Sequence, residues 1–286
     1  MHFYPEKFRI NDVAVRLSEL GHNVKVFTGK PNYHSGIVPK KFKTKKIIIE
    51  KYKGIEIFRF PIISRGKKSS YTKRALNYFS YITNLIFYQN KIILKEFNPD
   101  FAFVYGTSPI FQILPSFFSK QKKMKVVLWY QDLWPETLYD LKIIKNFFLK
   151  IILNNLISKI YKKTDFILVQ SMPFKKYMIE KGYKNKTFLY ENPCEKINIR
   201  NNKINNKLKV ITYGGNLGKA QNLNYLIKLG EYNKKNSLDI LIKIFGEGSE
   251  KENLKKKINE KHLQNYIKVF GFLEDSKFYK ELNKSD

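Results

Sequence analysis

The stretch KVITYGGNLGKAQNLNYLIKLGE, residues 209–231, joins a short apolar run, a glycine-rich turn and an amphipathic segment. The apolar run predicts a buried strand, and the spacing of the apolar residues after Gln221 predicts a helix. Glycine lets the backbone approach a phosphate closely, because it carries no Cβ. The free N–H groups and the positive dipole at the start of a helix favour the same anion. The stretch therefore predicts a strand–turn–helix unit suited to binding a diphosphate.

The turn supplies the first candidate binding residues. The backbone candidates are Gly214, Gly215 and Gly218, and Lys219 would add a full positive charge beside the start of the helix. The spacing matches neither the Walker A motif nor the GxGxxG fingerprint. An ordinary glycine-rich turn without a ligand fits the same residues, so both interpretations stay open at this point.

A second glycine-rich turn follows the next apolar run. In IFGEGS, residues 244–249, Gly246 and Gly248 come directly after a predicted strand and before a charged helix. Ligands of doubly wound sheets bind outside the carboxyl ends of the strands. Two such turns in one unit favour a nucleotide site.

Short apolar runs alternate with longer amphipathic stretches along the whole chain. The predicted strands are residues 23–28, 55–60, 101–105, 125–130, 166–170, 187–191, 208–213, 239–245 and 267–272. The predicted helices include residues 11–20, 71–97, 142–162, 173–181, 223–233 and 251–261. Near-continuous apolar strands that alternate with helices are typical of parallel sheets in an α/β fold.

A polar segment divides the strands into two series. EKINIRNNKINNK, residues 195–207, is rich in Asn and Lys and has the composition of a linker. We therefore expect a first domain at residues 1–195 and a second domain at residues 196–286.

Polar groups also follow the strand predicted at residues 125–130. In QDLWPE, residues 131–136, Asp132 could accept a hydrogen bond from a sugar hydroxyl, and Trp134 could stack on an apolar sugar face. Alternatively, Asp132 caps the turn and Trp134 fills the core.

Charge is the outlying feature of the composition. There are 54 Lys and Arg residues against 24 Asp and Glu, a net charge of +30. Such a charge attracts the phosphates of nucleic acid, anionic lipid or nucleotides. The chain is rich in lysine throughout, and a general compositional bias explains the excess as well. A non-enzymatic basic protein that binds nucleic acid or another polyanion is the alternative to an enzyme.

Cysteine and histidine bear on two classes of site. Cys194 is the only cysteine, so the chain has no internal disulfide and no cysteine-rich metal site. The four histidines are scattered, which disfavours a zinc cluster. We expect no metal, no cofactor and a reducing, cytosolic setting.

Two stretches bear on membrane contact. Residues 101–119 are uncharged and long enough to test as a span, but a glycine and two prolines break them into a strand, a loop and a helix. Residues 71–97 combine aromatics, aliphatics and lysines at helical spacing. That pattern fits either an interfacial helix on anionic lipid or a core helix with a lysine-rich solvent face. The charged start of the chain does not resemble a secretory signal.

The helix predicted at residues 11–20 lacks the strand that a buried parallel sheet normally places before it. Only residues 1–4 are available there, which is too few. We therefore expect the chain to be a fragment or the product of a disrupted reading frame.

Six segments in this order resemble the landmarks of retaining glycosyltransferases of family 4. The branch that they most resemble includes the bacterial L-fucosamine transferases of O-antigen and capsule assembly. The combination of QDLWPE with GNLGKAQ is the specific part. The segments are HFYPEKFRINDVAVRLSELGHNVKVFTGKPNY (residues 2–33), VVLWYQDLWPE (126–136), ILVQS (167–171), YGGNLGKAQNL (213–223), FGEGSE (245–250) and VFGFLED (269–275).

The resemblance implies a GT-B fold, in which two Rossmann-like domains with parallel sheets face each other across a cleft. The first domain would bind the acceptor and the second, here incomplete, the nucleotide-sugar donor. By position, Arg9 and Asn11 fall in the first cleft loop, which approaches the donor phosphates. Gln131 stands beside Asp132 where many relatives have a histidine that contacts the donor sugar.

In the second domain, the resemblance implies two further donor-binding positions. Asn216 and Gln221 fall where many relatives have an arginine and a lysine that hold the diphosphate. Lys219 would then supply the missing charge. The cleft would thus bring Gly214–Lys219, Gly246, Gly248, Arg9 and Asp132 to one groove.

The implied activity is transfer of a hexosyl or N-acetylated aminosugar residue from a UDP-sugar or similar donor, with retention of configuration. The acceptor would be a lipid-linked or surface glycan of lipopolysaccharide or capsule assembly, at the cytoplasmic face of the inner membrane. Lys219, the glycine turn and Arg9 would stabilise the leaving diphosphate, and Asp132 would orient a hydroxyl. Relatives carry an acidic motif beyond the point where this chain ends, at Asp286. We therefore expect weak UDP binding without useful transfer.

Overall fold

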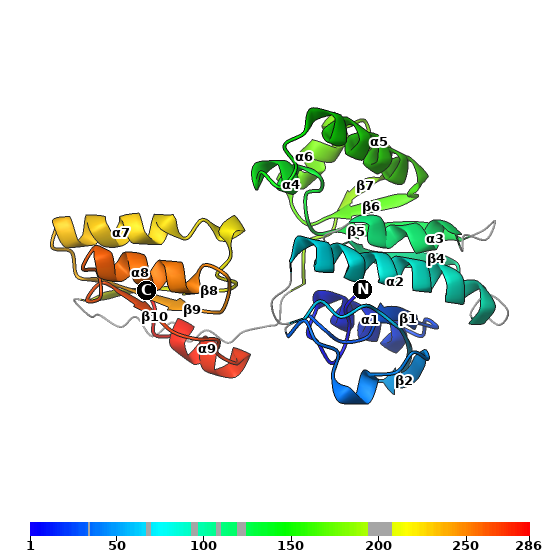
Figure 1. Ribbon diagram of the computed structural model, residues 1–286, viewed down its shortest axis with the longest axis horizontal. Helices are drawn as coiled ribbons and strands as arrows, with labels where there is room; N and C mark the ends of the chain where they lie inside the picture. Colours follow the sequence, from blue (N-terminus) through cyan, green and yellow to red (C-terminus); the bar gives the residue numbers. More distant parts are fainter. Residues whose placement is uncertain (34, 67–69, 93–96, 107–109, 119–123, 194–207) are drawn as a thin grey trace. The chain divides into compact units, whose positions relative to one another are not determined.

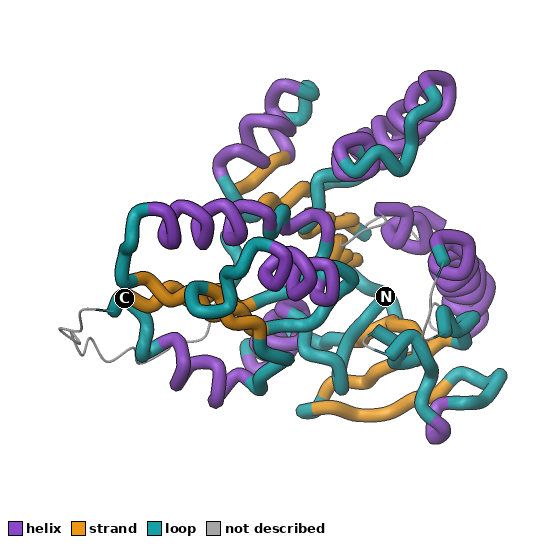
Figure 2. Tube along the Cα trace, turned by 60° about the vertical axis from the view of Figure 1, so that its left-hand side comes forward, coloured by secondary structure: helices purple, strands orange, loops and turns teal. Residues whose placement is uncertain are grey.

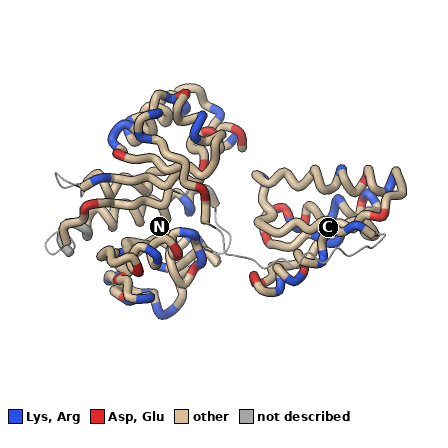
Figure 3. Tube along the Cα trace, turned by 180° about the vertical axis from the view of Figure 1, so that it is seen from behind, with Lys and Arg blue, Asp and Glu red and all other residues tan. Residues whose placement is uncertain are grey.

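The computed structural model of the chain describes residues 1–33, 35–66, 70–92, 97–106, 110–118, 124–193 and 208–286. The chain divides into two compact units, Met1–Pro193 and Cys194–Asp286 (Figure 1). The division falls two residues before the predicted boundary. Lys and Arg residues are spread over both units (Figure 3).

The first unit contains two sheets. One has the order β1-β3-β2, with β3 parallel to β1 and antiparallel to β2. The other has the order β4-β5-β6-β7, with every neighbouring pair parallel. The strands are β1 (Lys25–Gly29), β2 (Ile48–Tyr52), β3 (Ile55–Phe60), β4 (Phe101–Gly106), β5 (Lys125–Tyr130), β6 (Phe166–Val169) and β7 (Thr187–Leu189).

Helices flank these sheets (Figure 1). They are α1 (Arg9–Glu19), α2 (Tyr71–Ile92), α3 (Leu114–Phe118), α4 (Glu136–Asp140), α5 (Phe147–Lys163) and α6 (Met172–Glu180), with 3₁₀ turns at Lys40–Phe42, Ile110–Ile113 and Lys184–Lys186. Helix α5 begins five residues later than predicted, because Asn146 caps it: the Asn146 Oδ1 accepts the Leu149 N–H at 3.1 Å.

The core of the first unit explains why its strands were predictable. In β5 every residue from Val126 to Tyr130 is at most 7% exposed, as expected for a parallel strand covered on both faces. Strand β2 was not predicted. It is an antiparallel strand whose residues alternate between half-buried and exposed, and its lysine and glutamate obscure the apolar signal.

Neither stretch considered for membrane contact forms a span. Residues 101–106 form β4, Ile110–Ile113 a 3₁₀ turn and Leu114–Phe118 a short helix, as the glycine and prolines indicated. Within the described ranges, no helix is both long and apolar enough to cross a bilayer. Helix α2 buries one face at Asn77, Ser80, Tyr81 and Leu85, as a core helix does. It also exposes Leu76, Phe79 and Phe87, so both alternatives for residues 71–92 stay open. Residues 93–96 lie outside the described part.

The first residues of the chain form no strand, as predicted. The Gly29 N–H and the Thr28 hydroxyl instead donate hydrogen bonds to the Met1 carbonyl, at 2.8 and 2.6 Å. Met1 therefore lies beside the carboxyl end of β1.

The second unit is a three-stranded parallel sheet of order β10-β9-β8. Helices α7 and α8 cover one face, and α9 lies on the other (Figures 1 and 2). Leu217, Ile227, Ile244 and Leu254 belong to the core between the sheet and the first two helices. The elements are β8 (Lys209–Gly214), α7 (Asn224–Lys235), β9 (Ile240–Phe245), α8 (Lys251–Glu260), β10 (Ile267–Val269) and α9 (Asp275–Leu282), with a 3₁₀ turn at Lys219–Gln221.

Helix α9, which was not predicted, is tied to the sheet through Glu281. Its carboxylate accepts hydrogen bonds from Lys284 at 2.6 Å and from Lys243 of β9 at 3.2 Å. These bonds, that of Lys284 first, hold the pKa of Glu281 below its ordinary value of 4.5. A lowered pKa stabilises the fold above the unfolded value, and this stabilisation is lost as the pH falls through the folded pKa.

We therefore predict that Glu281→Gln flattens the acid limb of the stability curve below pH 4.5. Urea unfolding midpoints measured from pH 7 to pH 3 would show a smaller decrease in the variant. Glu274→Gln, which removes an exposed carboxylate of the same segment, is the matched control. Equal acid sensitivity of Glu281→Gln and the unsubstituted chain would show that this contact does not hold α9.

Candidate functional site

The two glycine-rich turns of the second unit pack directly on each other. The Gly215 N–H donates to the Phe245 carbonyl at 3.0 Å, and the Leu217 N–H donates to the Glu247 carbonyl at 2.9 Å. The Glu250 N–H donates in turn to the Leu217 carbonyl at 2.8 Å. Leu217 is fully buried and anchors the turn in the core. Both turns therefore form one structure at the carboxyl ends of β8 and β9.

Two of the candidate glycines are required by this packing. A Cβ on Gly246 would lie 1.9 Å from the Gly215 carbonyl oxygen, and Gly246 has a φ of +148°. A Cβ on Gly248 would lie 2.3 Å from the Leu217 carbonyl oxygen. The absence of a side chain thus serves the contact between the turns, whereas a ligand contact of these two glycines stays a prediction.

The glycines of the first turn have different surroundings. A Cβ on Gly214 would meet the Phe278 ring of α9 at 2.1 Å, so this glycine makes room for α9. A Cβ on Gly215 would meet no atom nearer than the Tyr213 hydroxyl, at 3.3 Å, and Gly215 is exposed. Among these four glycines, Gly215 is the one whose missing side chain is best suited to the approach of a ligand.

Asn216, Gly218 and Gln221 meet at one oxygen atom. The Gln221 Oε1 accepts the Gly218 N–H at 3.2 Å and the Asn216 side-chain amide at 3.4 Å. Both hydrogen bonds are at the protein surface. The structure therefore brings together the two positions at which the family resemblance implied diphosphate binding.

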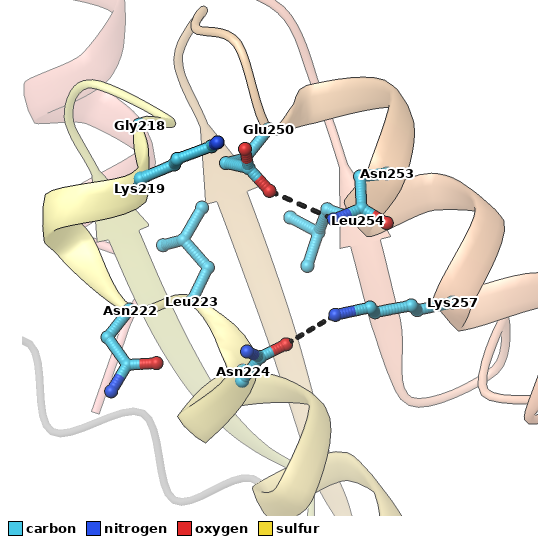
Figure 4. Close-up of a pocket in the computed structure, with 9 residues that line it drawn as sticks. All are labelled: Gly218, Lys219, Asn222, Leu223, Asn224, Glu250, Asn253, Leu254 and Lys257. Atoms are coloured by element: carbon cyan, nitrogen blue, oxygen red, sulfur yellow. Dashed lines mark hydrogen bonds between the residues drawn. The ribbon is translucent and has the colours of Figure 1, made fainter. Parts of the chain in front are cut away.

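A hollow of about 250 Å³ lies next to this turn, between the starts of α7 and α8 (Figure 4). Leu223 and Leu254 provide its apolar part. Its lining residues are Gly218, Lys219, Asn222, Leu223, Asn224, Glu250, Asn253, Leu254 and Lys257. The positive dipole ends of both helices lie at this region. Some of the N–H groups there are already bonded within the fold: the Tyr225 N–H donates to the Asn222 carbonyl and the Lys251 N–H to the Gly248 carbonyl.

Lys219 extends into the hollow, toward Glu250 (Figure 4). On the far side, the Lys257 ammonium donates to the Asn224 Oδ1 at 2.8 Å, and Asn253 donates to the Glu250 carboxylate at 2.9 Å. Two lysines therefore border the hollow with one glutamate. The charge that the sequence predicted beside the turn is present, and Glu250 partly offsets it.

In the first unit, the charges of Arg9 and Asp132 both affect the pKa of Tyr105. Burial raises the pKa of the Tyr105 hydroxyl, the Arg9 guanidinium lowers it, and the Asp132 carboxylate raises it. Tyr105 lies near the carboxyl end of β4, and Asp132 follows the carboxyl end of the neighbouring β5. The Arg9 Nη1 donates to the Pro193 carbonyl at 2.6 Å, which places Arg9 at the end of this unit. The charges of Arg9 and Asp132 thus both affect the Tyr105 hydroxyl, in opposite directions.

Gln131, which directly precedes Asp132, is 9% exposed. Its N–H donates to the Gly106 carbonyl at 3.0 Å, and its carbonyl accepts the Gln170 side-chain amide at 2.8 Å. Its Nε2 is buried and has no hydrogen-bond partner among the described residues. Gln131 therefore supports the loop through its backbone and has one unused donor.

Asn11 has a structural role that the sequence did not predict. Its side chain is 7% exposed, and its Nδ2 donates to the Glu6 carbonyl at 2.8 Å. This bond closes the turn before α1. Contact of Asn11 with donor phosphates stays a prediction, and the amide group that would make it is already bonded inside the fold.

Three aromatic residues fix the loop that carries Asp132. The Tyr130 hydroxyl accepts the Trp134 N–H at 2.7 Å and lies 2.8 Å from the Trp134 carbonyl, to which it donates. The Tyr161 hydroxyl lies 2.7 Å from that of Tyr130 and also reaches the Trp134 carbonyl, at 3.1 Å. Trp134 is 8% exposed and packs on Phe111, so the core-filling alternative for Trp134 is confirmed.

Tyr105 is a candidate site residue that the sequence argument missed. It ends the predicted strand at residues 101–105, and β4 pairs with β5 in parallel register, Tyr105 opposite Trp129. The carboxyl ends of neighbouring parallel strands lie at the same edge of a sheet. That rule could have indicated that Tyr105 lies near the residues that follow β5. Among the described residues, no group of three or more His, Cys, Asp and Glu side chains could hold a metal ion.

The second unit, which carries the packed glycine turns, also has a recognisable sequence. Residues 195–286 match the family model of glycosyl transferases group 1. No curated protein matches the chain in sequence.

Solved glycosyltransferases share the fold. Sucrose-phosphate synthase from Thermosynechococcus elongatus is 11% identical, with a TM-score of 0.65 over 96% of this chain and 67% of that one. The lipopolysaccharide outer core galactosyltransferase WaaB is 14% identical, with a TM-score of 0.51 over 90% and 71%. TarM of S. aureus is 16% identical, with a TM-score of 0.52 over 72% of this chain and 39% of TarM. The chain therefore spans about two fifths of TarM, and the predicted α/β fold of GT-B type is confirmed.

Proposed function

We propose that the chain is part of a glycosyltransferase whose second unit binds the diphosphate of a nucleoside-diphosphate sugar. The packed turns at the carboxyl ends of β8 and β9 carry this proposal, because they group Asn216, Gly218 and Gln221 at an exposed edge beside two helix starts. These residues lie within the segment that matches the glycosyltransferase family model.

Each group of the site has a proposed part in the transfer. The turn amides, Lys219 and Arg9 stabilise the charge that develops on the leaving diphosphate, and stabilisation of this kind usually contributes most to the rate of such enzymes. Asp132 orients a hydroxyl of donor or acceptor, and its place after the carboxyl end of β5, the strand that pairs with β4, supports that role. No metal takes part in this scheme.

The proposed substrates follow the family 4 branch that the sequence resembles. The donor is a UDP-sugar or a similarly activated hexose or aminosugar, transferred with retention. The acceptor is a lipid-linked glycan of O-antigen or capsule assembly, at the cytoplasmic face of a bacterial inner membrane.

Calorimetric titration with UDP, UMP and uridine tests donor binding by the 286-residue chain. We expect UDP to bind most tightly, because the turn recognises the second phosphate. Asn216→Ala and Gln221→Ala should each weaken UDP roughly tenfold, the effect of one lost hydrogen bond. Asn265→Ala, an exposed asparagine of the same unit, is the matched control and should bind UDP normally.

Binding to a polyanion is the competing outcome. If the +30 charge serves nucleic acid, an oligonucleotide should bind tightly and lose ~10³-fold or more in affinity over a modest rise in salt. Tight oligonucleotide binding together with UDP affinity that does not change in Asn216→Ala and Gln221→Ala would refute the donor site.

A further inference from the structure

The beginning of helix α5 exposes an unusual amount of apolar surface. Phe147, Phe148 and Ile152 are 69%, 73% and 56% exposed. We refer to residues 141–156 as the α5 tip. Its exposed large apolar side chains are Leu141, Ile143, Phe147, Phe148, Leu149, Ile151, Ile152 and Leu156.

The α5 tip is a firmly held structure and not a frayed end. The later part of the same helix is buried in the core through Ile157, Ile160 and Tyr161. The Tyr139 hydroxyl, from α4, donates to the Asn154 Oδ1 at 2.9 Å, and Asn146 caps the helix. The buried half therefore anchors a rigid apolar projection from the first unit.

Consecutive residues of the tip are exposed, so the apolar surface continues around the helix. Phe147, Phe148 and Leu149 are all more than half exposed, although they point in three directions about the helix axis. A helix that lies on its own protein body exposes polar residues on its outer face. This one presents aromatic and aliphatic groups there.

Charge identifies what the tip can contact. Residues 141–164 contain six lysines and no acidic residue, in a chain that carries 24 acids. Lys142 and Lys145 stand exposed immediately before the helix. Asp140, directly before the tip, is exposed and offsets part of this charge. A surface that combines apolar bulk with an excess of positive charge is complementary to an apolar phase bordered by negative charge.

We propose that the α5 tip docks the protein on the surface of an anionic lipid bilayer. Phe147, Phe148 and Ile152 enter the boundary between headgroups and acyl chains, and Lys142 and Lys145 contact the anionic headgroups. A second copy of the chain fits less well, because symmetric pairing of the tips would bring two sets of three lysines together. The inference does not depend on the proposed glycosyl transfer, since it concerns a different surface of the first unit.

Co-sedimentation with vesicles tests the apolar contact. Vesicles of phosphatidylcholine alone and with one third phosphatidylglycerol are compared. We expect binding to the anionic vesicles, reduced at least about tenfold in Phe147→Asn/Phe148→Asn. The matched control is Phe79→Asn/Phe87→Asn on α2, whose rings are 66% and 58% exposed, and it should bind as the unsubstituted chain does.

Charge reversal tests the electrostatic contact. Each lysine near an anionic surface is worth about fivefold in affinity, so Lys142→Glu/Lys145→Glu should lose ~25-fold or more. Lys268→Glu/Lys277→Glu, on exposed positions of the second unit, lowers the net charge from +30 by the same amount. Equal losses in both pairs would mean that only net charge matters, and this would overturn the assignment to the tip.

A tryptophan placed at the tip tests insertion directly. Trp129 and Trp134 are both buried, so Phe148→Trp adds the chain's exposed indole. Its emission should shift to the blue on anionic vesicles and be quenched by brominated acyl chains. Lipid binding that leaves this emission unchanged, or no lipid binding together with concentration-dependent dimers lost in Phe147→Asn/Phe148→Asn, would overturn the proposal. UDP binding should be the same in all of these variants.

Discussion

Replacing Gly246 with alanine is expected to destabilise the second unit by roughly 3 kcal/mol or more, from two additive causes. The φ of +148° is a backbone conformation that costs an L side chain ~1–3 kcal/mol. The new Cβ would also stand 1.9 Å from the Gly215 carbonyl oxygen, and relief of such overpacking costs ~1–3 kcal/mol. A backbone oxygen cannot move aside as the end of a side chain can. Since domains are stable by only ~5–15 kcal/mol, the two turns should separate or the unit should unfold.

Gly215→Ala is the informative partner of this variant. Its Cβ would meet the Tyr213 hydroxyl at 3.3 Å, a contact that a small side-chain shift relieves. We expect Gly215→Ala to keep the stability of the second unit within about 1 kcal/mol, and to weaken UDP binding because the new methyl group stands where the phosphate approaches.

Urea unfolding and UDP titration of both variants separate packing from ligand binding. Gly246→Ala should lower the free energy of unfolding of the second unit. Gly215→Ala should lower the affinity for UDP and leave the stability nearly unchanged. A stable Gly246→Ala protein would contradict the packing role of this glycine. Unchanged UDP affinity in a well-folded Gly215→Ala protein would remove this glycine from the donor site.

The position of the two packed turns that form the candidate site of the second unit could be predicted from the sequence, because its signals are local. Glycines directly after two apolar runs indicate turns at the carboxyl ends of two parallel strands, and such ends share one edge of a sheet. The separate roles of Gly215 and Gly246 could not be predicted. They depend on how closely two turns, about thirty residues apart in the chain, approach each other.

For other residues, the local sequence was less informative about structure and role. Asn11 has no sequence feature that distinguishes a buried turn-closing amide from a ligand-binding one. Tyr105 looks like any strand aromatic until the parallel register with β5 places it near the sheet edge after which Asp132 follows. Helix α9 was missed although its apolar residues are segregated on one side at least as clearly as those of α7 and α8. Its contacts with Gly214 and Lys243 are long-range, and no local pattern indicates them.

The apolar surface of α5 shows another limit of local patterns. Residues 142–162 have the pattern of one helix, and the apolar residues near its start are as frequent as those near its end. Which half is buried depends on where the sheet ends, and that is set by strands elsewhere in the chain. For the same reason the aromatic stretch at residues 71–97 appeared the stronger membrane candidate, although Tyr81 and Leu85 of α2 belong to the core.

Replacing Tyr130 with phenylalanine is expected to cost ~1–3 kcal/mol and to loosen the loop that carries Asp132. The hydroxyl is the hydrogen-bond acceptor of the buried Trp134 N–H, and a buried donor without a partner costs that amount. Burial raises the pKa of Tyr130, which keeps this hydroxyl in its neutral form at physiological pH. The phenyl ring fills the same space, so packing is unchanged and the effect isolates the hydrogen bonds.

Tyr161→Phe is the matched control, because it removes a hydroxyl from the same network but leaves the Trp134 N–H bonded to Tyr130. It should cost no more than ~1 kcal/mol. Hydrogen exchange of the peptide that spans residues 131–135 should accelerate in Tyr130→Phe and remain slow in Tyr161→Phe. In a transferase, a shift of Asp132 by about 1 Å is enough to reduce the rate ~10²-fold. Tyr130 is therefore expected to act as a positioning residue, and slow exchange in Tyr130→Phe would show that the loop is held by packing alone.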